Sequence, residues 1–289
     1  MDEFVRTHEA AIRLGFFLGT LAAMAAWELI APRRVLNTSK AARWRANLGM
    51  VAIDTLTVRL LVPVTAVGMA VLTEARGWGL LNQLALAQWL TVILGIAALD
   101  FAIYLQHVMF HAVPAFWRLH RVHHTDLDFD VTTGVRFHPV EILLSMGIKL
   151  AAVAALGPAP LAVVMFEVLL NATSLFNHGN VRLPVKMDRW LRLLVVTPEM
   201  HRVHHSIVPR ETNSNFGFNL PWWDRLCGTY RDQPGGGHEG MIIGLRQYRD
   251  PGHLTLPRLL VQPFSGKTED YPIDQRNGGD DSQAQGDRS

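Results

Sequence analysis

The chain has 289 residues, of which 49% are hydrophobic and 18% charged, and its mean hydropathy is +0.15. Soluble domains carry about 25% charged residues, so the composition argues against a water-soluble domain and indicates a membrane protein. The net charge of +2 gives no support for a nucleic-acid partner. The single cysteine, Cys227, excludes an intrachain disulfide and any cysteine-based zinc or iron–sulfur site.

The first predicted membrane span covers residues 11–30. The loop that follows is basic, and the positive-inside rule places it in the cytoplasm, with the N-terminus outside. Its basic residues are Arg33, Arg34, Lys40, Arg43 and Arg45. The second predicted span, residues 48–73, contains Asp54, Arg59 and Pro63. Charges inside a membrane usually face the interior of a helical bundle, so this span is expected to face other helices.

A third span over residues 84–110 carries the first histidine pair at its cytoplasmic end. Residues 140–156 and 161–176 then form two apolar helices around a Gly/Pro-rich turn, which is typical of a helical hairpin. Each arm is close to the roughly 20 residues that cross a bilayer. The sequence leaves open whether the hairpin crosses fully or re-enters the same face. The histidines before and after it are expected on one face, the cytoplasmic one.

Beyond residue 181 the chain is mixed and polar, and we expect short helices on the membrane surface. After about residue 267 the chain is too polar to bury a core and is expected to be disordered. Three regions result. They are N-terminal transmembrane helices (1–92), a histidine-rich core with the hairpin (93–235), and a surface segment with a disordered tail (236–289).

Ten of the 13 histidines lie between residues 107 and 205, and eight of these form three clusters. The clusters are His107 with His111, then His120, His123 and His124, and then the same pattern again in His201, His204 and His205. Residues four apart share one face of a helix, so a cluster can present two imidazoles to one cavity. Imidazole is the commonest metal ligand at neutral pH. The clusters therefore predict metal binding rather than a packed core of histidines.

The repeated His-x-x-His-His pattern favours two metals. Its adjacent histidines point about 100 degrees apart on a helix, which is awkward for one ion. An all-nitrogen site favours iron, zinc or copper over magnesium or calcium, and structural zinc usually needs only four ligands. We therefore expect two redox-active iron ions, with zinc as a substitute in purified protein. The predicted fold is all-α, a polytopic membrane helical bundle with this di-metal site at its cytoplasmic face.

Four single residues are further candidates for the site. His178 follows the hairpin and is expected to be a ligand, whereas His138 is either a ligand or the partner of one. Asp100 and Tyr104 lie on the helical stripe of the first histidine pair. A carboxylate behind a metal-bound histidine fixes its tautomer, so Asp100 either has this role or pairs with Arg59.

The match to a known pattern extends beyond the histidines. Residues 136–141 read Arg-Phe-His-Pro-Val-Glu, residues 215–217 read Asn-Phe-Gly, and residues 223–230 read Trp-Asp-Arg-Leu-Cys-Gly-Thr-Tyr. With Asp100 and Tyr104 before the first pair, and a hairpin between two His-x-x-His-His motifs, residues 94–230 resemble the fatty acid hydroxylase/sterol desaturase superfamily.

The resemblance implies a membrane-bound di-iron enzyme that uses O2 to hydroxylate or desaturate a lipid, such as a fatty acyl, alkyl or sterol-like chain. Residues 93–235 would be its catalytic core, in which Asp100, Glu141 and Asp224 are carboxylates behind the ligands or in the framework. One iron would take His111, His120, His123, His178 and His201, and the other would take His107, His124, His204 and His205.

The resemblance also implies an electron donor, and two other functions remain as alternatives. The chain is too short for an added haem or flavin domain, so a separate ferredoxin-, cytochrome- or pterin-type donor is expected. The alanine-rich, cysteine-poor sequence without a targeting signal favours a bacterial inner membrane. The alternatives are a histidine-rich metal transporter, which needs ligands along a path through the spans, and a structural zinc protein.

Overall fold

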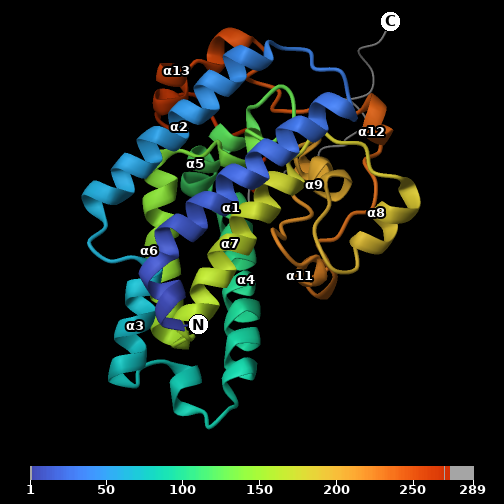
Figure 1. The fold of residues 1–289 in the computed structure, drawn as a ribbon. Coiled ribbons are helices and arrows are strands. Elements are labelled where there is room, and N and C mark those ends of the chain that lie inside the picture. The colour runs from blue at the N-terminus through green and yellow to red at the C-terminus, as the bar shows by residue number, and fades with distance from the viewer. Residues whose placement is uncertain (1, 270, 274–289) are drawn as a thin grey trace, which may run out of the picture.

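The computed structural model describes residues 2–269 and 271–273, which form helices and connecting loops (Figure 1). Within these residues there is no β-strand, only two isolated bridges that join Pro32 to Val181 and Ser206 to Ile243. The all-α prediction is therefore confirmed. Most of the tail that the sequence predicts to be disordered lies outside the described residues.

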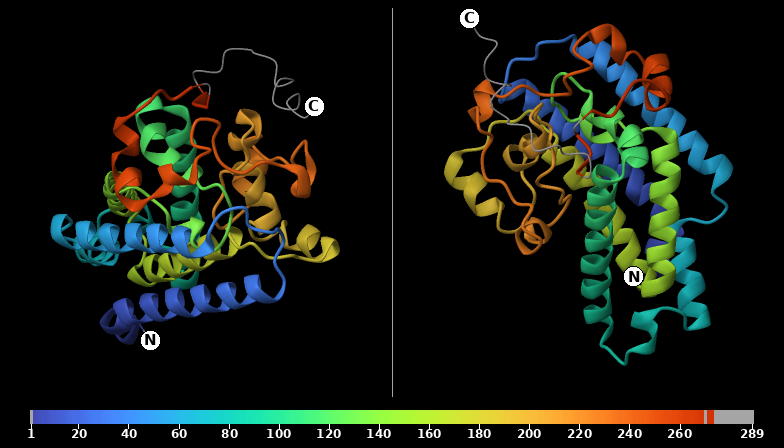
Figure 2. Two further views of the ribbon diagram at one scale, coloured as in Figure 1. Left: turned by 90° about the horizontal axis from the view of Figure 1, so that it is seen from above. Right: turned by 180° about the vertical axis from the view of Figure 1, so that it is seen from behind.

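Five apolar segments have the length and composition to cross a membrane, which identifies the chain as an integral membrane protein. They are α1 (Asp2–Ile30), α2 (Lys40–Leu61) continued by α3 (Ala66–Arg76) and η1 (Leu80–Gln83), α4 (Gln88–Ala112), α6 (Pro139–Leu156) and α7 (Pro160–Asn177). Helices α4 and α6 stand upright in the bundle, whereas α7 is inclined and α1 runs alongside it (Figures 1 and 2).

The second predicted span, residues 48–73, lies within one candidate membrane-crossing segment, and this segment consists of successive helices. α2 ends at Leu61 and α3 begins at Ala66. Pro63 lies between them and has no backbone N–H to continue the helix. α2 lies obliquely across one end of the bundle, and its buried face includes Arg43 and Asp54 (Figure 1). α2 and α3 together still carry the chain from this end to the other.

The predicted hairpin is present as α6 and α7, each of 18 residues. These helices pack with α3 and α4 around an apolar core that includes Leu99, Val153 and Phe166. The turn between them requires glycine, because Gly157 has a φ of +60° and a Cβ there would lie 2.4 Å from the Trp78 carbonyl oxygen. The hairpin tip is therefore held closely against the loop before α4.

The histidine-bearing segments meet at one end of the bundle. The C-terminal ends of α4 and α7 lie there together with α5 (Pro114–His124) and α9 (Pro198–His204) (Figures 1 and 2). This arrangement agrees with the prediction that the histidines before and after the hairpin emerge on one face.

Short helices cover the same end, as the sequence predicts for the region after residue 181. They are α8 (Val185–Leu191), α10 (Pro209–Thr212), α11 (Trp222–Leu226), α12 (Gly237–Gly240), η3 (Pro251–Leu254), α13 (Leu256–Val261) and η4 (Gln262–Phe264), with η2 (Thr133–Val135) earlier in the chain. The expectation of disorder from residue 267 onward is wrong for the described part of the tail, because Tyr271 is fully buried.

Candidate metal centre

Three helices and one helix end bring the histidines together. α4 presents His107 and His111 from its buried face, one turn apart. The chain then turns at Pro114, which begins α5 because proline fits the first turn of a helix. α9 starts in the same way, with Pro198 in its first turn and the Thr197 hydroxyl accepting a hydrogen bond from a backbone N–H. Both short helices are thereby fixed at their N-terminal ends.

Nine buried histidines form two groups, in each of which one nitrogen per residue lies within 4.8 Å of all the others. The first group is His107, His111, His120, His124 and His204, and the second group is His123, His178, His201 and His205. These are the nine histidines that the sequence predicts as ligands. The grouping differs from the division that the family resemblance implied, because His111 and His120 lie in the first group and His205 lies in the second.

The spacing within each group fits a metal ion. The Nε2 atoms of His107 and His120 lie 3.0 Å apart, and His178 Nε2 lies 3.2 Å from that of His123 and 3.1 Å from that of His201. Two nitrogens bound at about 2.1 Å to one ion, at right angles, would also lie about 3.0 Å apart.

Several ring nitrogens lack any other partner. Among the described residues, the buried atoms without a hydrogen bond include Nε2 of His111 and His204 and both ring nitrogens of His124 and His205. A buried polar atom without a partner is costly, and a bound cation would satisfy one ring nitrogen of each of these histidines. The donors present therefore fit two metal ions.

Burial keeps these imidazoles neutral, which is the form that binds metal. Burial lowers the pKa of His120 and of His178 to about 3. Burial, reinforced by the neighbouring histidines, lowers the pKa of His123 and His205 well below the ordinary value. At neutral pH the groups therefore offer lone pairs rather than positive charge.

Acceptors behind the rings fix the orientation of five histidines. His120 Nδ1 lies 2.6 Å from Glu141 Oε1, and His111 Nδ1 lies 3.0 Å from Asn213 Oδ1. Backbone carbonyl oxygens accept from the other three, with His107 bonded to Phe216 at 2.7 Å, His178 to Ser174 at 2.8 Å and His204 to Ser214 at 2.7 Å. Each contact places the proton on Nδ1 and leaves Nε2 free as a ligand.

Glu141 thus has the position expected of a carboxylate behind a ligand. The other candidates, His138, Tyr104 and Asp100, do not contact a histidine of either group in this way. His138 caps α6 by accepting from the Val140 N–H, and its Nε2 contacts the Leu260 carbonyl oxygen at 3.1 Å. The Tyr104 hydroxyl lies 3.0 Å from Thr229 Oγ1. Neither side chain belongs to a histidine group.

Asp100 neither supports a histidine nor pairs with Arg59, so both interpretations of this residue are wrong. Its Oδ2 accepts from Trp223 Nε1 at 2.7 Å and from the Leu220 N–H at 3.2 Å. Asp224 has a similar structural role, accepting backbone N–H groups of residues 216 and 217 at 2.8 and 2.9 Å. These carboxylates hold the loop that carries acceptors for the histidines.

Replacing Asp100 with alanine is therefore expected to lower stability without removing metal. The change leaves the Trp223 indole N–H and one backbone N–H without their acceptor, at a cost of about 1–3 kcal/mol. Thermal unfolding and metal analysis of the same purified sample would measure both effects. A loss of metal at unchanged stability would instead show that Asp100 supports a ligand.

Sequence reasoning missed the acceptors at Asn213 and Ser214 and the aromatic wall at Phe216 and Phe218. The Phe218 ring centroid lies 4.9 Å from that of His107 in the first group and 6.0 Å from that of His201 in the second. Phe218 also packs in the apolar core between α3, α4 and α7. It therefore connects the interior of the helical bundle with both histidine groups.

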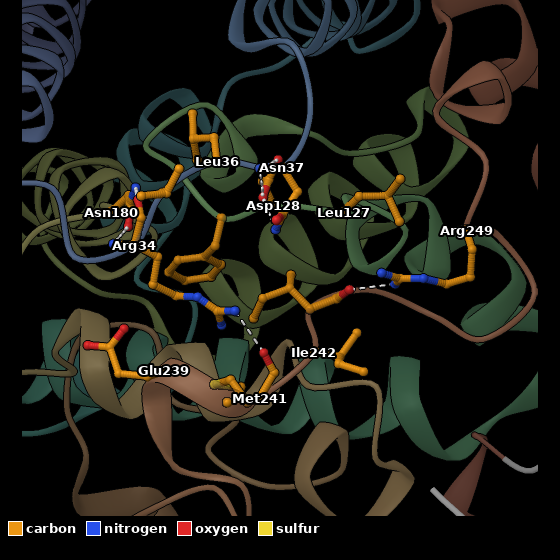
Figure 3. A pocket seen from close by; sticks show the side chains of 14 residues that line it. Arg34, Leu36, Asn37, Leu127, Asp128, Asn180, Glu239, Met241, Ile242 and Arg249 are labelled. Carbon is orange, nitrogen blue, oxygen red and sulfur yellow. Dashed lines mark hydrogen bonds between the residues drawn. The ribbon is translucent and has the colours of Figure 1, made fainter. Parts of the chain in front are cut away.

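A separate cavity of about 320 Å³ lies beside the second group (Figure 3). Phe129 forms part of its wall, and the Phe129 ring centroid lies 5.4 Å from that of His178. Arg34 also lines the cavity and donates to the Met241 carbonyl oxygen at 2.8 Å (Figure 3). The lining residues come from loops and from α12 rather than from the membrane-spanning helices, so the cavity lies outside the helical bundle.

Five apolar spans and two buried histidine groups at one end define an integral membrane protein with a candidate di-metal centre. The fatty acid hydroxylase family model matches residues 92–229. The match to this family model agrees with the resemblance found in the sequence.

The chain is also similar to individual proteins whose names describe lipid-modifying enzymes. The chain is 34% identical over 177 residues to ornithine lipid hydroxylase OlsE of Rhizobium tropici. This alignment covers 61% of this chain and 51% of the relative. The chain is 30% identical over 146 residues to alkylglycerol monooxygenase of Xenopus tropicalis (49% of this chain, 30% of that protein) and 26% identical over 162 residues to the human enzyme (54% and 33%). The chain spans about half or less of the length of these curated relatives. No solved structure matches it.

Proposed function

We propose that this protein is a membrane-bound di-iron oxidase that uses O2 to hydroxylate a lipid. The observation that carries the proposal is the pair of buried groups, five and four histidines, at one end of an apolar helical bundle. The relatives named above are lipid hydroxylases and monooxygenases, which supports hydroxylation over desaturation. Their substrates suggest a lipid with a polar headgroup for this chain as well.

In this proposal the first histidine group holds one iron and the second group holds the other. Two bound iron ions would supply the reduction of O2, so that one oxygen atom enters a C–H bond and the other leaves as water with two electrons and two protons from the donor. The chain itself orients the ligands through Glu141, Asn213 and three backbone carbonyls. It also excludes water, since all nine histidines are buried.

The apolar contacts support the lipid as substrate. Phe218 connects the bundle interior with both histidine groups, and Phe137 stacks on His123 at a centroid distance of 4.6 Å. An alkyl chain entering from the bundle would therefore meet aromatic walls on its way to the histidines. Holding a target carbon in this way can supply several kcal/mol of the barrier to reaction.

The proposal includes an orientation and a source of electrons. The basic loop after α1 lies at the histidine-bearing end, which by the positive-inside rule favours the cytoplasmic face of a bacterial inner membrane. Electrons would come from a separate ferredoxin-, cytochrome- or pterin-type donor. Zinc would be expected to replace iron in some purified preparations.

The test is a mass-spectrometric comparison of total lipids from cells that carry the native protein and cells that carry His204→Ala. We expect a lipid that gains one oxygen atom only with the native protein. A lipid that loses two hydrogen atoms would indicate a desaturase instead. No difference between the two, with intact protein and a supplied reductant, would contradict the proposal and favour metal transport, which uptake into vesicles would then measure.

A further inference from the structure

The segment that follows α13 binds the outer face of α5. Residues 262–269 and 271–273, which we call the C-terminal strap, begin at η4. Arg118 donates to the carbonyl oxygens of Pro263 at 2.7 Å and Gly266 at 3.0 Å. Arg121, which is fully buried, donates to the carbonyl oxygens of Gln262 at 2.5 Å and Lys267 at 2.8 Å, and also to that of Ser265. The arginines of α5 thus hold the strap, while its histidines face the metal groups.

The strap ends in an aromatic contact directly behind the first histidine group. Tyr271 stacks on Trp117 with ring centroids 5.7 Å apart, and both side chains are fully buried. The Trp117 ring centroid lies 4.8 Å from that of His111 and 5.3 Å from that of His124. Two aromatic layers therefore separate the first group from the polar side of the molecule.

A second contact runs from the strap to a histidine through one amide. Asn213 Nδ2 donates to the Tyr271 carbonyl oxygen at 2.7 Å, and Asn213 Oδ1 lies 3.0 Å from His111 Nδ1. A carbonyl oxygen can only accept, so the strap determines which end of the Asn213 amide faces His111. That end is the oxygen, which requires the proton on His111 Nδ1 and leaves Nε2 for the metal.

We propose that the C-terminal strap and Asn213 position His111 as a ligand of the first metal and shield that metal from water. Asn213 is a positioning residue, since it acts through His111. The inference rests on the proposed metal centre and deepens it, because it assigns the strap to the first of the two metals. The second group is the internal control, because the contacts of Asn213 and Tyr271 described above lead to His111 and to Trp117, which lies beside the first group.

The test is cobalt binding to purified full-length protein, measured by equilibrium dialysis and visible absorption. We expect the native protein to bind two Co²⁺ ions. Asn213→Ala should lower the affinity for one Co²⁺ ion by about 10- to 100-fold, as loss of a partner behind a metal-bound histidine usually does. The affinity for the other Co²⁺ ion should not change. Asn213→Asp, which keeps an acceptor oxygen for His111, should restore most of the affinity.

The strap itself has a separate readout, which is tryptic cleavage after Lys267. Tyr271→Ala removes the contact with Trp117 and is expected to expose this bond and to weaken binding of the same cobalt ion. Tyr271→Phe keeps the ring but loses the hydroxyl contacts with the Ile207 carbonyl oxygen and the Arg246 N–H, so both effects should be smaller than with alanine. Asn171→Ala, at an exposed position of α7 whose side chain bonds only within its own helix, is the matched control.

Three outcomes can be distinguished. Native protein that binds no cobalt would contradict the metal centre and with it the proposed function. Native binding with unchanged affinities in Asn213→Ala would overturn the positioning role alone. Equal weakening of both ions in Asn213→Ala would also overturn it, because the effect would then be general rather than directed through His111.

Discussion

Replacing His204 with alanine is expected to abolish lipid oxidation while the protein remains in the membrane. The His204 ring is the contribution of α9 to the first group, with its centroid 4.6 Å from that of His107, 4.7 Å from that of His111 and 4.6 Å from that of His124. Its Nδ1 donates to the Ser214 carbonyl oxygen at 2.7 Å, and its Nε2 has no partner. Loss of a residue behind a ligand already lowers affinity about 10- to 100-fold, so loss of the ligand should lower turnover by at least about 100-fold.

Two measurements separate this effect from misfolding. Metal analysis of the purified variant should find the first ion lost and the second retained, because His204 belongs to one group only. His253→Ala, at an exposed position of η3, should keep both ions and native turnover. Full activity in the His204→Ala variant would mean that the histidine groups are not the reactive centre.

The presence of a metal site is predictable from sequence because histidine spacing is a local property. Residues four apart share a helical face, so His107 and His111 must lie together wherever α4 is placed. The division into two groups is not local. It depends on how α4, α5 and α9 cross, and His111 and His120 join one group because α5 folds back against the end of α4.

Single polar residues are harder to assign for the same reason. Asp100 is four residues from Tyr104 and seven from His107 on one helical stripe, yet its partner is Trp223, far along the chain. Asn213 receives its role from Tyr271, an aromatic residue in an otherwise polar tail. A composition average predicts disorder there, whereas one buried ring and the backbone carbonyls of the strap are enough to fix the segment.

The break between α2 and α3 falls at Pro63, although the apolar run continues on both sides of this residue. The consequence is that α2 lies across the histidine-bearing end instead of standing within the bundle. Arg43 lies on the buried face of α2 and binds Asp126 and Asp130 in the loop after α5, and Asp54 lies on the same face. The burial of Arg43 is thereby explained by its contacts beside the site rather than by membrane crossing.

Replacing Arg43 with methionine is expected to destabilise the protein by about 3–5 kcal/mol, the usual cost of breaking a buried ion pair. Arg43 is 3% exposed and binds Asp126 through two bonds of 2.6 and 2.8 Å and Asp130 through one of 2.5 Å. Burial alone would raise the pKa of Asp126, but the guanidiniums of Arg43 and Arg136 hold this pKa well below its usual range. Without Arg43 two buried carboxylates lose their main counter-charge directly after the second histidine cluster.

The measurement is the midpoint of thermal unfolding in detergent, which should fall by about 10 °C. Arg45→Met, at an exposed position of the same helix, is the matched control and should change it little. The double variant Arg43→Met/Asp126→Asn removes a charge from each side and is expected to recover part of the loss. If Arg43→Met were no worse than Arg45→Met, the loop after α5 would be held by its other contacts. The position of α2 across the site would then follow from the fold of the histidine core rather than stabilise it.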